Sequence, residues 1–201
     1  LLGNHTDYNE GYVLSFAIDN AVYAAAGPSG EEQSCGFFST ELSDKPVVTA
    51  QRSDDDATNW INYPLGVYTV YNQNGYPLKP FNLAVHSTIP SGAGLSSSAA
   101  LEVATACALG ALWDRHPDPL RCAQLCRTAE NEFVGTRCGL LDQFSSVFGK
   151  AGEALFIDFR SLDHETLPLA DPTVKLAVCG SGVSHSLVDS AYNDRRAECD
   201  A

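Results

Sequence analysis

The chain has 201 residues, of which 44% are hydrophobic and 18% charged, a composition typical of a globular protein with a well-formed core. Its formal net charge is -13 at pH 7, from 12 basic and 25 acidic side chains, which argues against binding to nucleic acid. No apolar stretch reaches the roughly 18 residues of a membrane-spanning helix, so a membrane protein is not expected either.

Turn-forming residues divide the first half of the chain into segments with distinct patterns. In residues 11–26, apolar side chains alternate with small or polar ones, which predicts strand structure ending at a turn over 27–30. Residues 44–59 are polar and predict a surface loop, whose aspartates 54–56 are more typical of solvated side chains than of a metal site. The apolar spacing in 60–71 predicts a helix, closed by an Asn-Gly turn at 74–75.

The second half predicts a strand over 81–89, then a long helix rich in Ala and Leu that begins near Ser98. Prolines 117 and 119 separate this helix from a second one over 120–133. Short strands are expected at 154–159 and 174–179. Because strands and helices do not alternate strictly, we predict an α+β fold rather than a doubly wound sheet.

The seven cysteines contain no Cys-x-x-Cys pair and no Cys/His cluster at zinc spacing. Three of them, Cys107, Cys122 and Cys126, fall in the predicted helices among Ala and Leu. We therefore expect buried free thiols and a reducing, cytoplasmic location rather than disulfides or a metal site.

The sharpest functional signal is the stretch 90–100, which lies between the predicted strand and the long helix and reads Pro-Ser-Gly-Ala-Gly-Leu-Ser-Ser-Ser-Ala-Ala. Its glycines permit backbone angles that turn successive N–H groups inward, and its serines add hydroxyls at the positive end of a helix. Such a cradle can hold a polyphosphate despite the acidic composition. The stretch lacks the Lys of a Walker A loop and the third glycine of a dinucleotide fingerprint, so a simple helix cap stays open from these residues alone.

Residues 90–104 closely resemble the second signature of the kinases that phosphorylate galactose, homoserine, mevalonate and phosphomevalonate (the GHMP kinases). Residues 3–9, Gly-Asn-His-Thr-Asp-Tyr-Asn, resemble the galactokinase signature, whose usual form is Gly-Glu-His-Thr-Asp-Tyr-Asn. Two more stretches agree with that family: 138–144, Cys-Gly-Leu-Leu-Asp-Gln-Phe, and 185–199, from His-Ser-Leu to Arg-Arg-Ala-Glu-Cys. Four motifs in the family's order make the resemblance to galactokinases specific.

The resemblance implies an N-terminal GHMP-kinase domain with a mixed sheet packed on helices. It also implies transfer of the γ-phosphoryl group of ATP, with Mg²⁺, to the C1 hydroxyl of galactose. The expected nucleotide-binding residues are Gly92, Ala93, Gly94, Leu95, Ser96, Ser97, Ser98 and Trp60, the last near the adenine. The expected magnesium ligands are Ser98 and Glu130, and the expected catalytic base is Asp142. The expected sugar-binding residues are Asn4, His5, Thr6, Asp7, Gly139 and Asp142.

Each role also answers a physical demand, because phosphoryl transfer needs positioning and charge neutralisation, and magnesium prefers a few oxygen ligands. Taken singly, however, these residue types have commoner roles: a helix cap for Asp142, a turn for His5, the core for Trp60 and a solvated helix face for Glu130. It is their order along the chain that favours a kinase.

Three departures from the family pattern bear on these expectations. Asn4 stands where the family has a sugar-binding Glu, which removes a charge-assisted hydrogen bond and leaves the exact sugar open. The family's arginine beside the catalytic Asp would precede Leu1, and its third glycine-rich signature would follow Ala201. We therefore expect the pattern to be truncated at both ends, with an ATP-binding domain over 1–170, the beginning of a second domain over 171–201, and little or no kinase activity from these residues alone.

Two other functions remain open. One is a kinase for a related sugar, such as N-acetylgalactosamine or arabinose, and the other is a catalytically silent sensor of galactose and ATP. The intact run of serines 96–98, followed by two alanines, favours catalysis over the sensor. We expect a monomer whose partners are a small sugar and ATP, with no nucleic acid and no membrane.

Overall fold

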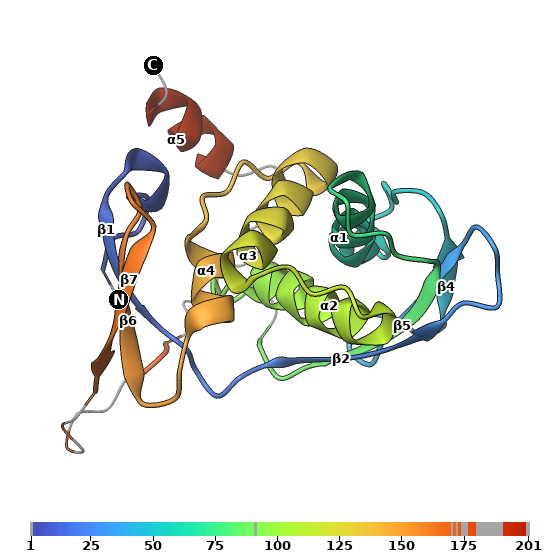
Figure 1. Cartoon of the computed structure of the whole chain (residues 1–201), viewed down its shortest axis with the longest axis horizontal. Coiled ribbons are helices and arrows are strands. Elements are labelled where there is room, and N and C mark those ends of the chain that lie inside the picture. The colour runs from blue at the N-terminus through green and yellow to red at the C-terminus, as the bar shows by residue number, and fades with distance from the viewer. Residues whose placement is uncertain are drawn as a thin grey trace.

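The computed structural model describes residues 2–90, 92–169, 171, 173, 177–179 and 191–199, except the side chains of 191, 192 and 195. These residues form two β-sheets and a group of helices (Figure 1). The strands are β1 (Tyr12–Phe16), β2 (Val22–Pro28), β3 (Cys35–Ser39), β4 (Val47–Thr49), β5 (Phe81–Ser87), β6 (Glu153–Asp158) and β7 (Asp163–Pro168). The helices are η1 (Asp7–Asn9), η2 (Asn59–Ile61), α1 (Asn62–Gln73), α2 (Ser97–Trp113), α3 (Pro119–Thr128), η3 (Ala129–Val134), α4 (Leu141–Phe148) and α5 (Ala191–Cys199).

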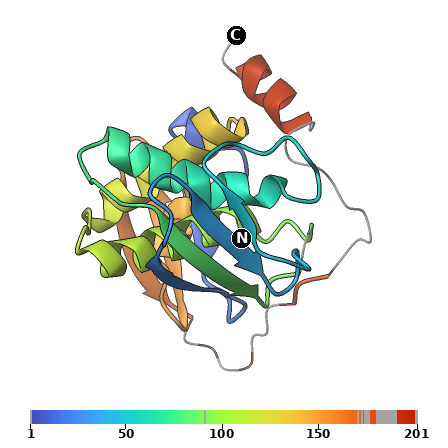
Figure 2. The ribbon, with the colours of Figure 1, turned by 90° about the vertical axis from the view of Figure 1, so that its right-hand side faces the viewer.

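The larger sheet has the order β2-β5-β3-β4 and is mixed, because β3 runs parallel to β5 while the other pairs are antiparallel. The smaller sheet, β1-β6-β7, is antiparallel throughout. Helices α1 and α2 lie over one side of the larger sheet, and α4 lies beside the smaller one (Figures 1 and 2). A mixed sheet packed on helices confirms the predicted α+β class.

The main core lies between the larger sheet and α1, α2 and α3. Strand β5 shows the strict alternation on which its prediction rests, since Phe81, Leu83 and Val85 are buried and the residues between them are exposed. Phe81 meets Phe37 of β3 edge to face, with ring centroids 5.6 Å apart. This packing fixes the start of β5, and the glycine-serine loop follows the other end of the strand.

A second core holds α4 against the smaller sheet. Phe144 of α4 is fully buried, and it packs with Val13 of β1 and Ile157 of β6. Because α4 is anchored by this one apolar face, its first turn, which carries Asp142, is held beside the start of α2. The second core therefore positions the expected catalytic carboxylate.

The structure corrects several sequence-based expectations. The strand predicted over 11–26 is two strands in different sheets, separated by residues 17–21, where Thr88 receives a hydrogen bond from Asn20 and Ala21. The predicted loop over 44–59 contains β4, and the helix predicted over 120–133 changes at Thr128 into a π-helical turn. Of the strand predicted at 174–179, residues 177–179 have no regular structure and 174–176 lie outside the described residues, as does the start of the 185–199 motif.

The seven cysteines are all free in the structure, as expected. Cys122 and Cys126 are buried in α3, but Cys107 on α2 is exposed, so the expectation of burial was wrong for that thiol. In the ranges that the structure describes, no helix is both long and apolar enough to cross a bilayer.

Candidate active site

The glycine-serine loop runs from the end of β5 to the first turn of α2, as the sequence predicted. Gly92 and Gly94 both have a φ of 67°, a left-handed conformation that favours glycine over every other residue. Ser96 shares this conformation, with a φ of 56°, although it carries a side chain. Its carbonyl oxygen accepts the N–H of Ala100, which starts the helix, but its hydroxyl makes no cap bond. The Ser96 hydroxyl is therefore available to a neighbouring side chain of the site.

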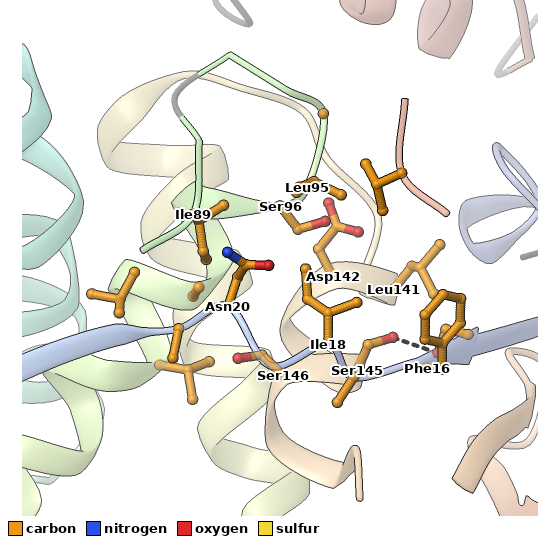
Figure 3. Close-up of a pocket in the computed structure, with 18 of the residues that line it drawn as sticks. Phe16, Ile18, Asn20, Ile89, Leu95, Ser96, Leu141, Asp142, Ser145 and Ser146 are labelled. Atoms are coloured by element: carbon orange, nitrogen blue, oxygen red, sulfur yellow. Dashed lines mark hydrogen bonds between the residues drawn. The ribbon is translucent and has the colours of Figure 1, made fainter. Parts of the chain in front are cut away.

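That neighbouring side chain is Asp142, at the start of α4. Its carboxylate and the Ser96 side chain lie next to each other and point toward one another at a cavity of about 640 Å³ that both residues line (Figure 3). Asp142 is accessible from the cavity, although protein atoms surround it closely on its other sides. The pKa of Asp142 is raised overall, mainly because this crowding disfavours the charged carboxylate. The hydrogen bond with the Ser96 hydroxyl lowers the pKa, and the negative charge of Asp7 raises it. The carboxylate thus lies against the loop that the sequence assigns to phosphate.

The turn over residues 3–11 places the galactokinase-like motif beside α4. His5 has a φ of 64°, and its Nδ1 is hydrogen-bonded to the Tyr8 hydroxyl. The Thr6 hydroxyl donates to the carbonyl oxygens of Gly3, at 2.6 Å, and Tyr12, at 3.0 Å, so Thr6 holds the turn together. Asn4 is exposed at the edge of the cavity that Asp142 lines.

Asp7 joins this turn to the loop before α4. Its Oδ2 accepts the backbone N–H of Leu141, at 3.1 Å. Gly139 faces the same carboxylate so closely that a β-carbon there would overlap it. Asp7 and Gly139 also line a second hollow of about 460 Å³, together with Arg127, Arg137 and Arg196. Of the expected sugar-binding residues, Asn4 and Asp142 line the first cavity and Asp7 and Gly139 line the second hollow, whereas His5 and Thr6 line neither.

Glu130 and Ser98 form the part of the site expected to hold magnesium. Glu130 lies in the π turn η3 and is only 3% exposed. Burial raises its pKa to about 7; hydrogen bonds from Cys138, Ser98 and Gln143 lower the pKa, whereas the charge of Asp142 raises it. The interaction with Ser98 brings one hydroxyl oxygen and one carboxylate together at the start of α2.

The oxygen atoms at this place suit Mg²⁺, which binds through few protein ligands and completes its shell with phosphate oxygens and waters. In the described part of the chain, no ion pair joins Glu130, Glu102 or Asp142 to a basic side chain. No group of three or more His, Cys, Asp and Glu side chains there could hold a metal ion by itself. A cation would therefore depend on a bound polyphosphate as well as on Ser98 and Glu130.

Trp60 is not brought to this cavity. It is 6% exposed, packs edge to face against Phe37 in the main core, and does not line the cavity of Asp142. Its indole Nε1 is buried without a hydrogen-bond partner among the described residues. The position near the adenine that the sequence predicts for Trp60 therefore stays a prediction.

Sequence reasoning missed two buried polar residues beside the site, Glu102 of α2 and Gln143 of α4. Both are 0% exposed, and the Gln143 amide donates to Glu102 and to Glu130. The signal that could have found Glu102 is a single carboxylate in the apolar run over 99–112, where a charge needs a buried partner.

A glycine-rich loop that opens a helix and faces a carboxylate, in an α+β fold, is the arrangement of a GHMP kinase. The model of the GHMP kinase N-terminal domain matches residues 62–150, and that of the galactokinase galactose-binding signature matches residues 1–28. The chain belongs to the galactokinase family.

Individual relatives agree with this assignment. The galactokinase of Thermotoga neapolitana is 40% identical over 200 residues, covering 100% of this chain and 55% of the relative. The crystal structure of Lactococcus lactis galactokinase complexed with galactose matches with a TM-score of 0.85 and 30% identity, covering 98% of this chain and 52% of that one. Methanococcus jannaschii mevalonate kinase, with a TM-score of 0.65 and 19% identity, shares the fold. The chain spans about half the length of the galactokinases it matches.

Proposed function

We propose that the protein is an ATP-dependent galactokinase, a phosphotransferase that phosphorylates the C1 hydroxyl of galactose, and that this chain supplies its nucleotide-binding half. The observation that carries the proposal is the placement of Asp142 against the glycine-serine loop, at a cavity that both line (Figure 3). A base and a phosphate cradle that line one cavity side by side suit phosphoryl transfer to a hydroxyl. The similarity to galactokinases, one of them crystallised with galactose, supports galactose as the acceptor.

In the proposed reaction, the Asp142 carboxylate takes the proton of the sugar C1 hydroxyl. The C1 oxygen then forms a bond to the γ-phosphorus of ATP, while the bond from that phosphorus to the β–γ bridging oxygen breaks. The products are galactose 1-phosphate and ADP. The loop over 92–98 would hold the phosphates with inward N–H groups and the positive end of α2. The Ser96 hydroxyl would orient the base.

Ser98 and Glu130 would hold Mg²⁺, which when bound neutralises charge on the phosphate oxygens. The support is the pairing of the Ser98 hydroxyl with a buried carboxylate that has no basic partner among the described side chains. Asp7 and Gly139 would meet the sugar near Asp142, with Asn4 and His5 at the edge of the site and Thr6 fixing the turn. Trp60 would form part of the wall behind the adenine.

We further propose that residues 1–170 act as the ATP-binding domain and that 171–201 begin a second one. The hydrogen bond from the Arg137 N–H to the Asn193 side chain, at 3.0 Å, supports contact between these two parts near the second hollow. The free thiols favour a reducing compartment, which supports work in the cytoplasm, where ATP is available.

The test is phosphoryl transfer by the full-length protein. ADP release is measured with ATP, Mg²⁺ and each of galactose, N-acetylgalactosamine and arabinose, for wild type and Asp142→Asn. We expect galactose-dependent turnover in wild type and a loss of about 10²-fold or more in kcat in Asp142→Asn, because the amide cannot take the proton. Asp44→Asn, the same change at an exposed position outside the site, is the matched control. Near-normal turnover in Asp142→Asn would refute the base, and turnover with another sugar alone would refute galactose.

A further inference from the structure

Three buried side chains from different helices form one polar cluster beside the proposed magnesium site. The Gln143 Nε2 of α4 donates to Glu102 Oε2 of α2, at 3.0 Å, and to Glu130 Oε2 of η3, at 2.7 Å. Gln143 and Glu102 are 0% exposed and Glu130 is 3% exposed. Gln143 lies one residue from Asp142 along α4. Of this cluster, Glu102-Gln143-Glu130, only Glu130 has a part in the proposed chemistry.

The geometry fixes the orientation of the Gln143 amide. An amide nitrogen carries two hydrogens, and here each has its own carboxylate oxygen. With both carboxylates ionised, the reverse orientation would place the amide oxygen against two acceptors. The remaining oxygens, Glu102 Oε1 and Gln143 Oε1, are buried without partners among the described residues. A network that leaves buried acceptors unpaired is costly as pure scaffolding, which points to a role in the site.

The cluster holds Glu130 by one oxygen. The Gln143 amide and the Cys138 thiol both donate hydrogen bonds to Oε2 of Glu130, the thiol at 3.4 Å. The other carboxylate oxygen is not engaged by either donor, and the Ser98 hydroxyl interacts with the same carboxylate. A carboxylate whose one oxygen is clamped and whose other oxygen is available beside a hydroxyl is prepared for a cation.

We propose that Gln143, held in place by Glu102, is a positioning residue that orients the Glu130 carboxylate toward the metal of the metal–nucleotide complex. This inference rests on the proposed function and adds to it two residues that do not touch the substrates. It predicts that the cluster controls metal affinity much more than sugar affinity. A merely structural role would lower stability and leave metal affinity unchanged.

The experiment uses the full-length protein and measures binding of Mn²⁺ with a non-hydrolysable ATP analogue by electron paramagnetic resonance, together with thermal unfolding. We expect Gln143→Leu to weaken Mn²⁺ binding roughly 10- to 100-fold, the usual effect of losing an outer partner of a metal ligand. The sugar KM should stay near its wild-type value. Gln124→Leu, the same change on α3 away from the cluster, is the matched control. Should Gln143→Leu not fold, Gln143→Met provides the same test with a more flexible side chain.

A second pair of variants separates hydrogen bonding from packing. Glu102→Gln keeps an oxygen acceptor for the Gln143 amide, whereas Glu102→Leu removes it. The proposal requires Glu102→Gln to retain most of the Mn²⁺ affinity that Glu102→Leu loses. Folded Gln143→Leu with Mn²⁺ affinity within about twofold of wild type would overturn it. If the wild-type protein itself binds no Mn²⁺–nucleotide complex, the proposed function fails and this inference fails with it. If the wild-type protein binds the complex and the variants bind it equally well, this inference alone fails.

Discussion

The contact between Gly139 and Asp7 allows a sharp test of how the sugar end of the site is built. In Gly139→Ala the new β-carbon would lie 2.8 Å from Asp7 Oδ1 and still closer to its Cγ and Oδ2. Since β-carbons essentially never approach another atom within 3.0 Å, the Asp7 carboxylate must move away. All three nearest atoms belong to the side chain of Asp7, the residue that is proposed to bind the sugar.

The displacement costs Asp7 its hydrogen bond from the Leu141 N–H, now 3.1 Å long. A hydrogen bond to a charged group contributes about 1.5–3 kcal/mol, and half-exposure of Asp7 favours the lower end of that range. If the same carboxylate binds the sugar, a loss of about 1.5 kcal/mol corresponds to roughly tenfold weaker galactose binding. The KM for ATP should change little, because the glycine-serine loop is not displaced.

The assay is galactose and ATP kinetics of the full-length protein, with calorimetric binding of galactose and thermal unfolding. Gly30→Ala, at an exposed glycine with nothing within 4 Å of the added carbon, is the control. In an Asp7→Ala background the overlap disappears, so Gly139→Ala should become nearly neutral. An unchanged galactose KM in Gly139→Ala, with Asp7 still present, would show that Asp7 does not bind the sugar.

Two further predictions concern the carboxylates. Ser96→Gly should be about 1 kcal/mol more stable than Ser96→Ala, because only glycine adopts the φ of 56° without strain, and thermal unfolding measures the difference. Both variants lose the hydroxyl that lowers the pKa of Asp142, so the acidic limb of the kcat/KM–pH profile should move to higher pH; an unmoved limb would exclude this contact. In metal-free buffer, the raised pKa of Glu130, about 7 against an ordinary 4.5, stabilises the fold below pH 4.5 and withdraws that stability as pH rises through 7. Glu130→Gln should therefore reduce, by an amount on the order of 3 kcal/mol, the decline in unfolding free energy between pH 4.5 and 7.5; buried Glu102, whose pKa is also raised, keeps part of that decline, so an undiminished decline in the variant would contradict the assignment.

The parts of the fold that follow from local pattern could be predicted from the sequence. Strand β5 alternates buried and exposed residues, and α2 combines high helix propensity with a glycine-serine start, so both were placed correctly. Strand β3 has four of five residues buried and no alternation, which removes the usual signal for a strand. The break between β1 and β2 depends on hydrogen bonds to Thr88, a residue far along the chain. The sequence near the break therefore contains no signal that predicts it.

The candidate site divides in the same way. The glycine-serine loop and the Asp142 segment could be identified because their residues lie close together in the sequence. The cluster Glu102-Gln143-Glu130 could not, since Gln143 meets residues 41 and 13 positions away through the packing of three helices. Likewise, nothing near Ser96 indicates that its hydroxyl serves Asp142 instead of capping α2.

The π turn at Ala129–Val134 has a consequence for anyone who redesigns this protein. The carbonyl oxygen of Glu130 accepts the N–H groups of both Gly135, at 2.9 Å, and Thr136, at 3.2 Å, so the helix ends in a turn wider than an α-helical one. Each residue of an α-helix advances the side chain by about 100°, so regularising this turn would rotate Glu130 relative to the segment that leads to Asp142. A stabilised version of α3 must therefore keep the irregular turn, because an ideal helix there would separate the two carboxylates.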